Sequence, residues 1–229
     1  MVPMKRLLVG PLLLLALWVT TAFGAEAALN RWWSPTDGAL LSLSCGHDLR
    51  GNVAVGVRTV PVKVVIVLDE EWRLHFGDAA QDQARVIVTR AAGLYRNLGV
   101  QATLLRVEPW MSPDTVSVAG GFLDRAENEV DLQDADIAVI FTYQELDGSE
   151  DGLAEVGGRY AFVRHHSGHG GQDEFVLAHE LGHIFGAHHG CDVPGFAGIM
   201  AESGFEQPPL VCPCTRRVLE INVGRFHGF

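Results

Sequence analysis

The sequence predicts an α/β domain built on a mostly parallel β-sheet, and three observations carry this prediction. Residues 60–69 form a continuous β-branched run, which is typical of a strand buried on both faces. The next segment, which ends at Gly99, repeats apolar residues at steps of four and three, as one face of an amphipathic helix does. Two more apolar runs, 100–110 and 136–143, are predicted strands. A strand, a helix and two further strands are the beginning of a parallel α/β sheet.

The N-terminus has the layout of a secretory signal peptide, which we predict for residues 1–27. The basic pair Lys5 and Arg6 precedes an apolar run at residues 7–23, and a small-residue cleavage site follows at residues 25–27. An uncleaved membrane anchor is the alternative, but the run is short for spanning a bilayer. We therefore expect a secreted or periplasmic protein with no stable membrane association after signal cleavage.

The rest of the chain divides into an N-terminal extension, residues 28–59, and one domain, residues 60–229. The extension has no strong hydrophobic period, and the domain is long enough to bury a sizeable core. The net charge of −11 at pH 7 is the opposite of what a nucleic-acid or anionic-membrane binder carries. No nucleic-acid partner is expected.

Four cysteines in an exported chain favour two disulfides. Only Pro213 separates Cys212 from Cys214, so a bond between them would be strained. Cys45 and Cys191 are the other available partners, and we predict that Cys191 pairs with Cys212 or Cys214. A zinc site made of all four thiolates is the alternative, although the spacing lacks paired C-x-x-C knuckles.

The second half of the domain shows weaker patterns before a clear helix. Residues 111–134 are loop-like with some helical character, and the glycine-flanked segment 152–171 predicts edge strands and loops. Residues 172–185 predict a helix with acidic side chains in its first turn. A C-terminal helix is expected at residues 215–226, with Thr215 as a possible N-cap.

A cluster of histidines marks the end of the helix at 172–185. His179 and His183 are four residues apart, so both lie on one face and can reach the same metal ion. Gly186 can adopt a positive φ, end the helix and turn the chain back. A third imidazole can then come from His188 or His189.

The whole pattern H-E-x-x-H-x-x-G-x-x-H resembles the zinc signature of the metzincin metalloproteases. The resemblance implies that one catalytic Zn²⁺ is bound by His179, His183 and His189, and that Glu180 is the general base. It also implies a methionine turn below the metal, matched by Met200 eleven residues after His189.

The chain from about residue 60 to residue 224 is similar to the reprolysin-like (adamalysin-like) branch of the metzincins. This branch implies a twisted, mostly parallel sheet with an antiparallel edge strand, an active-site helix and a small C-terminal subdomain. It also implies that the edge strand, matched by Gly152, Leu153 and Ala154, holds the substrate backbone by β-augmentation. An ordinary surface loop is the alternative for that segment. The branch usually has Asp after the third histidine, whereas this chain has Gly190, with Asp192 two residues later.

Two other features could be functional, but we favour a structural interpretation for each. His165, His166 and His169 lie in a glycine-rich stretch without regular ligand spacing, which indicates a polar loop at the cleft rim rather than a second metal site. Cys45 could act as a latency switch on the zinc, but a disulfide is the simpler interpretation.

The expected function is that of an exported zinc-dependent endopeptidase, a hydrolase that acts on protein or peptide substrates. Zinc with three protein ligands leaves a position for water, and Glu180 beside it can accept a proton. The alternative is a catalytically silent, zinc-containing binding module on the same fold.

Overall fold

The computed structural model describes part of the chain, all of it within the compact unit Gly51–Phe229: residues 59–165, 172–189, 198–201 and 213–223. The predicted signal peptide and nearly all of the predicted extension lie outside the described residues. So do several residues named in the sequence analysis: Cys45, Cys191, Cys212, His166, His169, Gly190 and Asp192. Cys214 lies in a described helix, but its side chain is outside the description as well.

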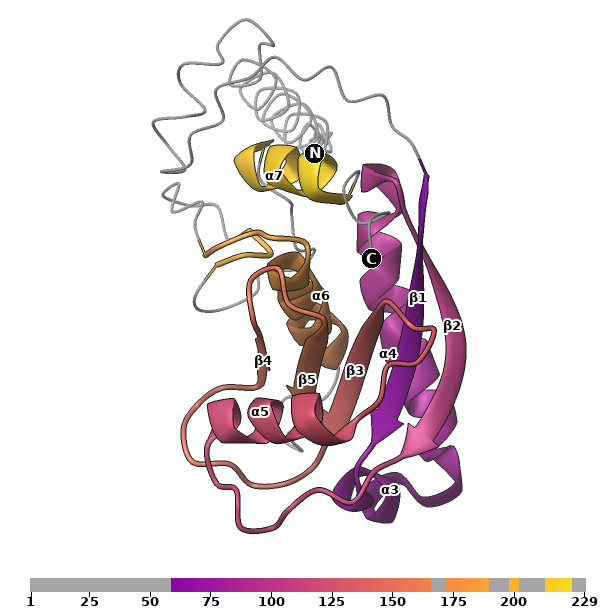
Figure 1. Cartoon of the computed structure of the whole chain (residues 1–229), viewed down its shortest axis with the longest axis vertical. Helices are drawn as coiled ribbons and strands as arrows, with labels where there is room; N and C mark the ends of the chain where they lie inside the picture. Colours follow the sequence, from indigo (N-terminus) through magenta and orange to yellow (C-terminus); the bar gives the residue numbers. More distant parts are fainter. Residues whose placement is uncertain (1–58, 166–171, 190–197, 202–212, 224–229) are drawn as a thin grey trace, which may run out of the picture. The chain divides into compact units, whose positions relative to one another are not determined.

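Five strands form one sheet, and they are β1 (Val60–Leu68), β2 (Val100–Pro109), β3 (Ile137–Thr142), β4 (Gly152–Ala154) and β5 (Tyr160–Arg164). Their order in space is β2-β1-β3-β5-β4 (Figure 1). Strands β2, β1, β3 and β5 are parallel, and β4 pairs with β5 in the antiparallel sense. The mixed sheet with an antiparallel edge strand confirms the predicted fold class.

In the described residues, five helices accompany the sheet: α3 (Glu70–Phe76), α4 (Ala80–Tyr95), α5 (Ala119–Glu129), α6 (Asp173–Ile184) and α7 (Pro213–Val223). Two short 3₁₀ turns, Gly77–Ala79 and Arg96–Leu98, flank α4. Of these helices, α3 was not predicted, because its pattern covers only seven residues. Asp69 defines its start, since its carboxylate accepts a hydrogen bond from the Trp72 backbone N–H at 2.8 Å.

The alternation of strand residues divides the core into two layers. Val64 and Ile66 of β1 belong to the cluster with α4 and α6, whereas Val65 and Val67 belong to the cluster with α5. The same alternation holds in β3 and β5. Both faces of β3, of β5 and of β1 from Val64 onward are therefore covered, which explains why these segments are almost continuously apolar.

The C-terminal helix begins earlier than expected, so the prediction of Thr215 as its N-cap is wrong. Helix α7 starts at Pro213, and Thr215 is a buried residue inside its first turn. Proline suits the first position of a helix, because it has no N–H and its φ is already helical.

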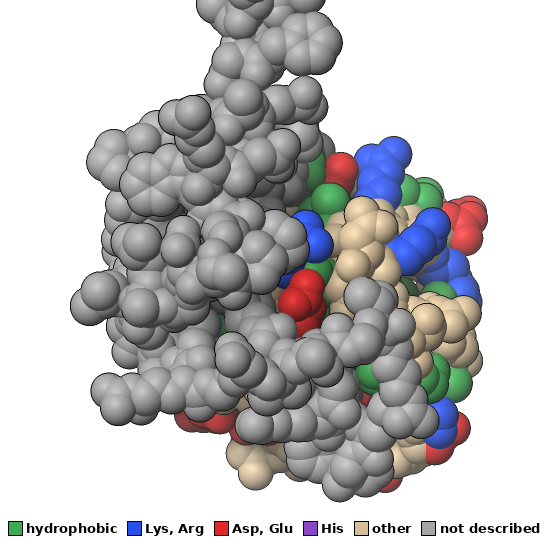
Figure 2. Space-filling view, turned by 90° about the horizontal axis from the view of Figure 1, so that it is seen from above, with side chains coloured by type: hydrophobic (Ala, Val, Ile, Leu, Met, Phe, Trp, Pro, Cys, Tyr) green, Lys and Arg blue, Asp and Glu red, His purple; other side chains and the backbone are tan. Residues whose placement is uncertain are grey.

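The described surface carries both signs of charge. Figure 2 shows acidic and basic side chains interspersed over the coloured part of the surface. Arg106 and Glu108 on β2, for example, form an ion pair at 2.8 Å. Among the residues with described structure, we find no helix with the length and apolar character that crossing a bilayer requires.

Candidate active site

Helix α6 carries two of the predicted zinc ligands through the interior of the domain. It packs against α4 on one side and against β4 and β5 on the other. Asp173 and Glu174 occupy its first turn, where the helix dipole favours acidic groups. Its interior position buries even the polar side chains of His179, Glu180 and His183. Buried polar groups need partners, so their surroundings define what this site can do.

The helix ends in a turn that only glycine fits. Gly186 has φ +85°, and its N–H donates to the His183 carbonyl at 2.8 Å. A Cβ at Gly186 would overlap Nδ2 of Asn222, which donates to the Phe185 carbonyl at 3.0 Å. The expected reversal at Gly186 is confirmed, and it returns the chain toward the metal site at His189.

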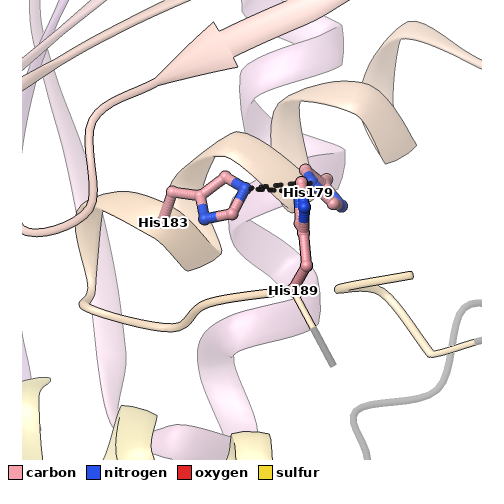
Figure 3. Close-up of side chains that lie close together, drawn as sticks. All are labelled: His179, His183 and His189. Atoms are coloured by element: carbon pink, nitrogen blue, oxygen red, sulfur yellow. Dashed lines mark hydrogen bonds between the residues drawn. The ribbon is translucent and has the colours of Figure 1, made fainter. Parts of the chain in front are cut away.

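The rings of His179, His183 and His189 point toward one another (Figure 3). Their Nε2 atoms lie 3.1 Å apart for His179 and His183, and 3.0 Å apart for each of the pairs with His189. This is the histidine group that the described residues bring together, and it does not include His188.

Backbone carbonyls fix the protonation of the two buried rings. Nδ1 of His179 lies 2.6 Å from the Ile199 carbonyl, and Nδ1 of His183 lies 2.8 Å from the Ala187 carbonyl. A carbonyl can only accept, so each Nδ1 carries the proton and each Nε2 presents a lone pair. Burial, together with the His183 ring, lowers the pKa of His179 to about 4. Burial also lowers the pKa of His183, so both rings are neutral at pH 7.

This donor set fits a zinc ion. Nitrogen lone pairs that converge within 3.0–3.1 Å repel one another unless a cation lies between them. A tetrahedral zinc ion with bonds of about 2.0–2.1 Å separates its nitrogen ligands by roughly 3.3–3.4 Å. A small outward movement of the rings is enough to reach that geometry. Three imidazoles with outer-shell carbonyls are also a common zinc environment.

Met200 lies directly beneath the helix that carries the ligands. It is almost fully buried, and a Cβ added at Gly182 would overlap its Sδ atom. The same Cβ would lie 3.1 Å from the hydroxyl oxygen of Tyr95, which donates a hydrogen bond to the Ala178 carbonyl. The glycine between the two histidines of the motif therefore allows α6 to lie against Met200 and Tyr95.

Replacing Gly182 with alanine should destabilise the protein despite the higher helix propensity of alanine. The propensity gain is about 1 kcal/mol, whereas overpacking costs about 1–3 kcal/mol. Urea unfolding of the zinc-loaded protein measures the difference. If the collision with Met200 is the cause, Gly182→Ala combined with Met200→Ala should be less destabilised than the sum of the single variants. Additive effects would contradict this packing.

Glu180 lies between α6 and the edge strand. Its side chain is only 5% exposed, and burial raises its pKa to about 8, against an opposing interaction with the backbone of Ala154. A Cβ added at Gly152 would lie 3.0 Å from Oε1 of Glu180 and 2.7 Å from Cγ1 of Val176. The lack of a side chain at Gly152 thus lets β4 approach the carboxylate.

The backbone N–H and C=O groups of β4 point alternately toward β5 and away from it. The N–H of Arg164 donates to the Asp151 carbonyl at 2.7 Å, so this pair is hydrogen-bonded across the ladder. Antiparallel ladders alternate, so Leu153 directs its N–H and C=O toward β5, whereas Gly152 and Ala154 direct theirs away from β5. Among the described strands, none pairs with this outer edge. The edge therefore offers backbone donors and acceptors beside Glu180.

The structure also contains contacts that the sequence did not suggest. His165, interpreted as part of a polar loop, is mostly buried and bonds through Nδ1 to Oδ2 of Asp173 at 2.6 Å. The Tyr95 hydroxyl reaches α6 from α4, and Arg164 holds the loop before β4. None of these residues has a periodic or spaced signal that would single it out.

The fold resembles solved structures of low sequence identity. An archaemetzincin from Methanopyrus kandleri is 21% identical, with a TM-score of 0.54, and the match covers 76% of this chain and 99% of that one. A second match, titled as the structure of a chaperone–substrate complex, is 14% identical, with a TM-score of 0.58. It covers 73% of this chain and 34% of that one, so this chain spans about a third of that protein's length.

A family model gives the more specific comparison. The model Reprolysin_5, described as metallo-peptidase family M12, matches residues 58–206. The match begins just before β1 and includes the sheet, α6, the three converging histidines and Met200. With more than half of its length matched, and with a metal-ligand triad beside a buried glutamate, the chain belongs to the metallo-peptidase family M12.

Proposed function

We propose that this protein is an exported zinc-dependent endopeptidase that cleaves extended protein segments. The observation that carries the proposal is the convergence of three Nε2 atoms next to a buried carboxylate and an open strand edge. These are the parts that peptide hydrolysis needs: a metal site, a base and a surface that holds the substrate backbone.

The chemistry assigns a separate task to each residue. His179, His183 and His189 would hold the zinc ion, which would supply Lewis acidity and make water more acidic near neutral pH. Glu180 accepts the proton from the attacking water and then gives it to the leaving amine. A nearby cation favours the carboxylate form of Glu180, which offsets the effect of burial on its pKa.

The edge strand β4 is the proposed substrate platform. A peptide bond is cut only if its carbonyl is held in a defined place, so the peptide must lie extended and in register beside Glu180. The outward-facing backbone groups of Gly152 and Ala154 can fix such a strand in the antiparallel sense. Main-chain pairing does not distinguish one amino-acid type from another. Any preference for particular substrate side chains must therefore come from other residues near the metal site.

Replacing Ala154 with proline tests this platform. Proline removes the outward N–H, whereas the ladder bonds to β5 come from Leu153 and remain. We expect kcat/KM for a peptide to fall at least about tenfold, because the N–H that proline removes is offered to the substrate and also interacts with the Glu180 carboxylate. Ala154→Ser keeps the N–H and is the matched control. Parental kcat/KM in Ala154→Pro, at equal zinc content, would place the substrate elsewhere.

The peptidase function itself is tested with casein. The zinc-loaded protein should produce new internal termini, detectable by mass spectrometry, and a zinc chelator should suppress them. Release of terminal residues alone would argue against an endopeptidase. A catalytically silent binding module would retain casein without producing any new terminus, and that result would refute the proposed function.

Export is a separate part of the proposal, supported by the basic pair, the apolar run and the small-residue site within residues 1–27. The full chain expressed in a bacterium with a tagged C-terminus should appear outside the cytoplasm. N-terminal sequencing should then begin at Ala28. A full-length cytoplasmic product would contradict this part.

A further inference from the structure

The guanidinium of Arg164 is buried at the end of β5, next to the loop that leads into β4. Its side chain is only 5% exposed. Nη1 donates to the Leu146 carbonyl at 2.8 Å, and Nη2 donates to the Gly148 carbonyl at 3.4 Å. Nη2 also lies 3.6 Å from the carboxylate of Asp151, the residue directly before β4. One side chain thus contacts the loop at three successive places.

Strand β4 needs such support because its own ladder is short. Only three residue pairs join it to β5, too few to fix a strand firmly. The first half of the loop has other attachments: Gln144 donates to the Val116 carbonyl at 3.0 Å, and the Asp147 N–H bonds to the Ser117 carbonyl. The half that leads into β4 meets Arg164 at Gly148 and Asp151.

The properties of arginine indicate that this side chain orients the loop and does not only fill space. Burial of a guanidinium is costly in solvation free energy, and among the described residues Nε of Arg164 has no hydrogen-bond partner. An apolar side chain would fill the volume at a lower solvation cost. What arginine adds is a rigid fork that bonds several carbonyl groups at fixed angles.

The next residue, His165, contacts the helix α6 that carries Glu180. Successive side chains of an extended chain point to opposite sides. His165 bonds to Asp173 in the first turn of α6 at 2.6 Å, and its backbone N–H donates to the Thr142 carbonyl at 2.9 Å. Two consecutive residues therefore anchor the strand beside the substrate and the helix that carries Glu180.

We propose that Arg164 is a positioning residue that holds β4 at its working distance from α6 and so governs peptide binding. This inference rests on the proposed peptidase function and goes beyond it, because Arg164 touches neither the metal ligands nor Glu180 in any described contact. Loss of the fork should loosen β4 and leave zinc binding intact. The defect should therefore appear in KM more than in kcat.

The experiment compares Arg164→Met and Arg164→Lys with matched variants at Arg106. Arg106 is a suitable control because its guanidinium also donates to loop carbonyls, those of Asp131 and Leu132, but from β2 at the opposite edge of the sheet. KM and kcat are measured with a quenched peptide that contains a casein cleavage site. Hydrogen exchange of the β4 amides and zinc content are measured on the same samples.

We expect Arg164→Met to raise KM by about tenfold, as loss of bonds to a charged group would, with zinc content unchanged. Exchange of the Leu153 amide, which faces β5 in the ladder, should accelerate by a similar factor, with a smaller effect in Arg164→Lys. Arg106→Met should lower the melting temperature without either change. Parental KM and exchange in Arg164→Met would overturn the inference.

Two further outcomes remain decisive. If Arg164→Met does not fold, Arg164→Lys and Asp151→Asn replace it in the experiment. Hydrogen-exchange rates of the β4 amides equal to those of the parent in both variants would overturn the inference. If the parent protein shows no peptidase activity, the proposed function fails. Exchange at β4 then still decides whether Arg164 holds the strand.

Discussion

Replacing Glu180 with glutamine is expected to abolish proteolysis while zinc stays bound. Glutamine keeps the shape of the side chain between Val176 and β4, but it cannot accept the proton from water. Loss of a general base costs at least about a hundredfold in rate. Casein cleavage and elemental analysis of the same preparation measure the two quantities.

Glu174→Gln is the matched control for this change. Glu174 lies on the same helix, six residues earlier, and it pairs at 3.3 Å with the exposed Arg90. Its replacement should leave activity near the parental level, because surface ion pairs contribute little to stability. A Glu180→Gln protein that cleaves casein as fast as Glu174→Gln would contradict the assigned role of Glu180.

The second large effect concerns the third ligand. His188 and His189 are adjacent, and both are exposed, but only Nε2 of His189 lies 3.0 Å from Nε2 of both His179 and His183. His189→Ala should lower zinc affinity by more than the roughly 10–100-fold that loss of an outer-shell partner costs. His188→Ala should bind zinc as the parent does.

The two histidine variants control for each other, because each removes one exposed imidazole from the same turn. Competition with a chromophoric chelator gives the zinc affinity of both. The opposite order, with weak binding in His188→Ala and parental binding in His189→Ala, would reverse the ligand assignment. Equal zinc affinities of the two variants would show that neither His188 nor His189 is the third ligand.

The sequence predicted the parts of this site that depend on local periodicity. The i, i+4 spacing placed His179 and His183 on one helix face, and Gly186 has the positive φ that the reversal requires. The buried strands could also be predicted from the sequence, because strands covered on both faces are apolar throughout. Helix α3 was missed because seven residues hold too few turns for a periodic signal.

The rest of the site depends on contacts between distant segments, which leave no local pattern. The Tyr95 hydroxyl reaches Ala178 across 83 positions of sequence. Arg164 and Asp173 could not be distinguished from ordinary polar residues, because their partners are loop carbonyls and a histidine on another element. The short strand β4 was suggested by its glycines, but its pairing sense came from the family resemblance and its register from the structure.

The most direct test of a histidine-bound catalytic zinc is a titration of the metal-free protein with zinc, with peptide cleavage measured at each addition. Three histidine ligands form one site, so activity should rise linearly and reach its plateau at about one zinc per chain. The protein with His179→Ala, titrated in parallel, should gain no comparable activity. Full activity in the metal-free protein, or an equal rise in the His179→Ala protein, would contradict the account.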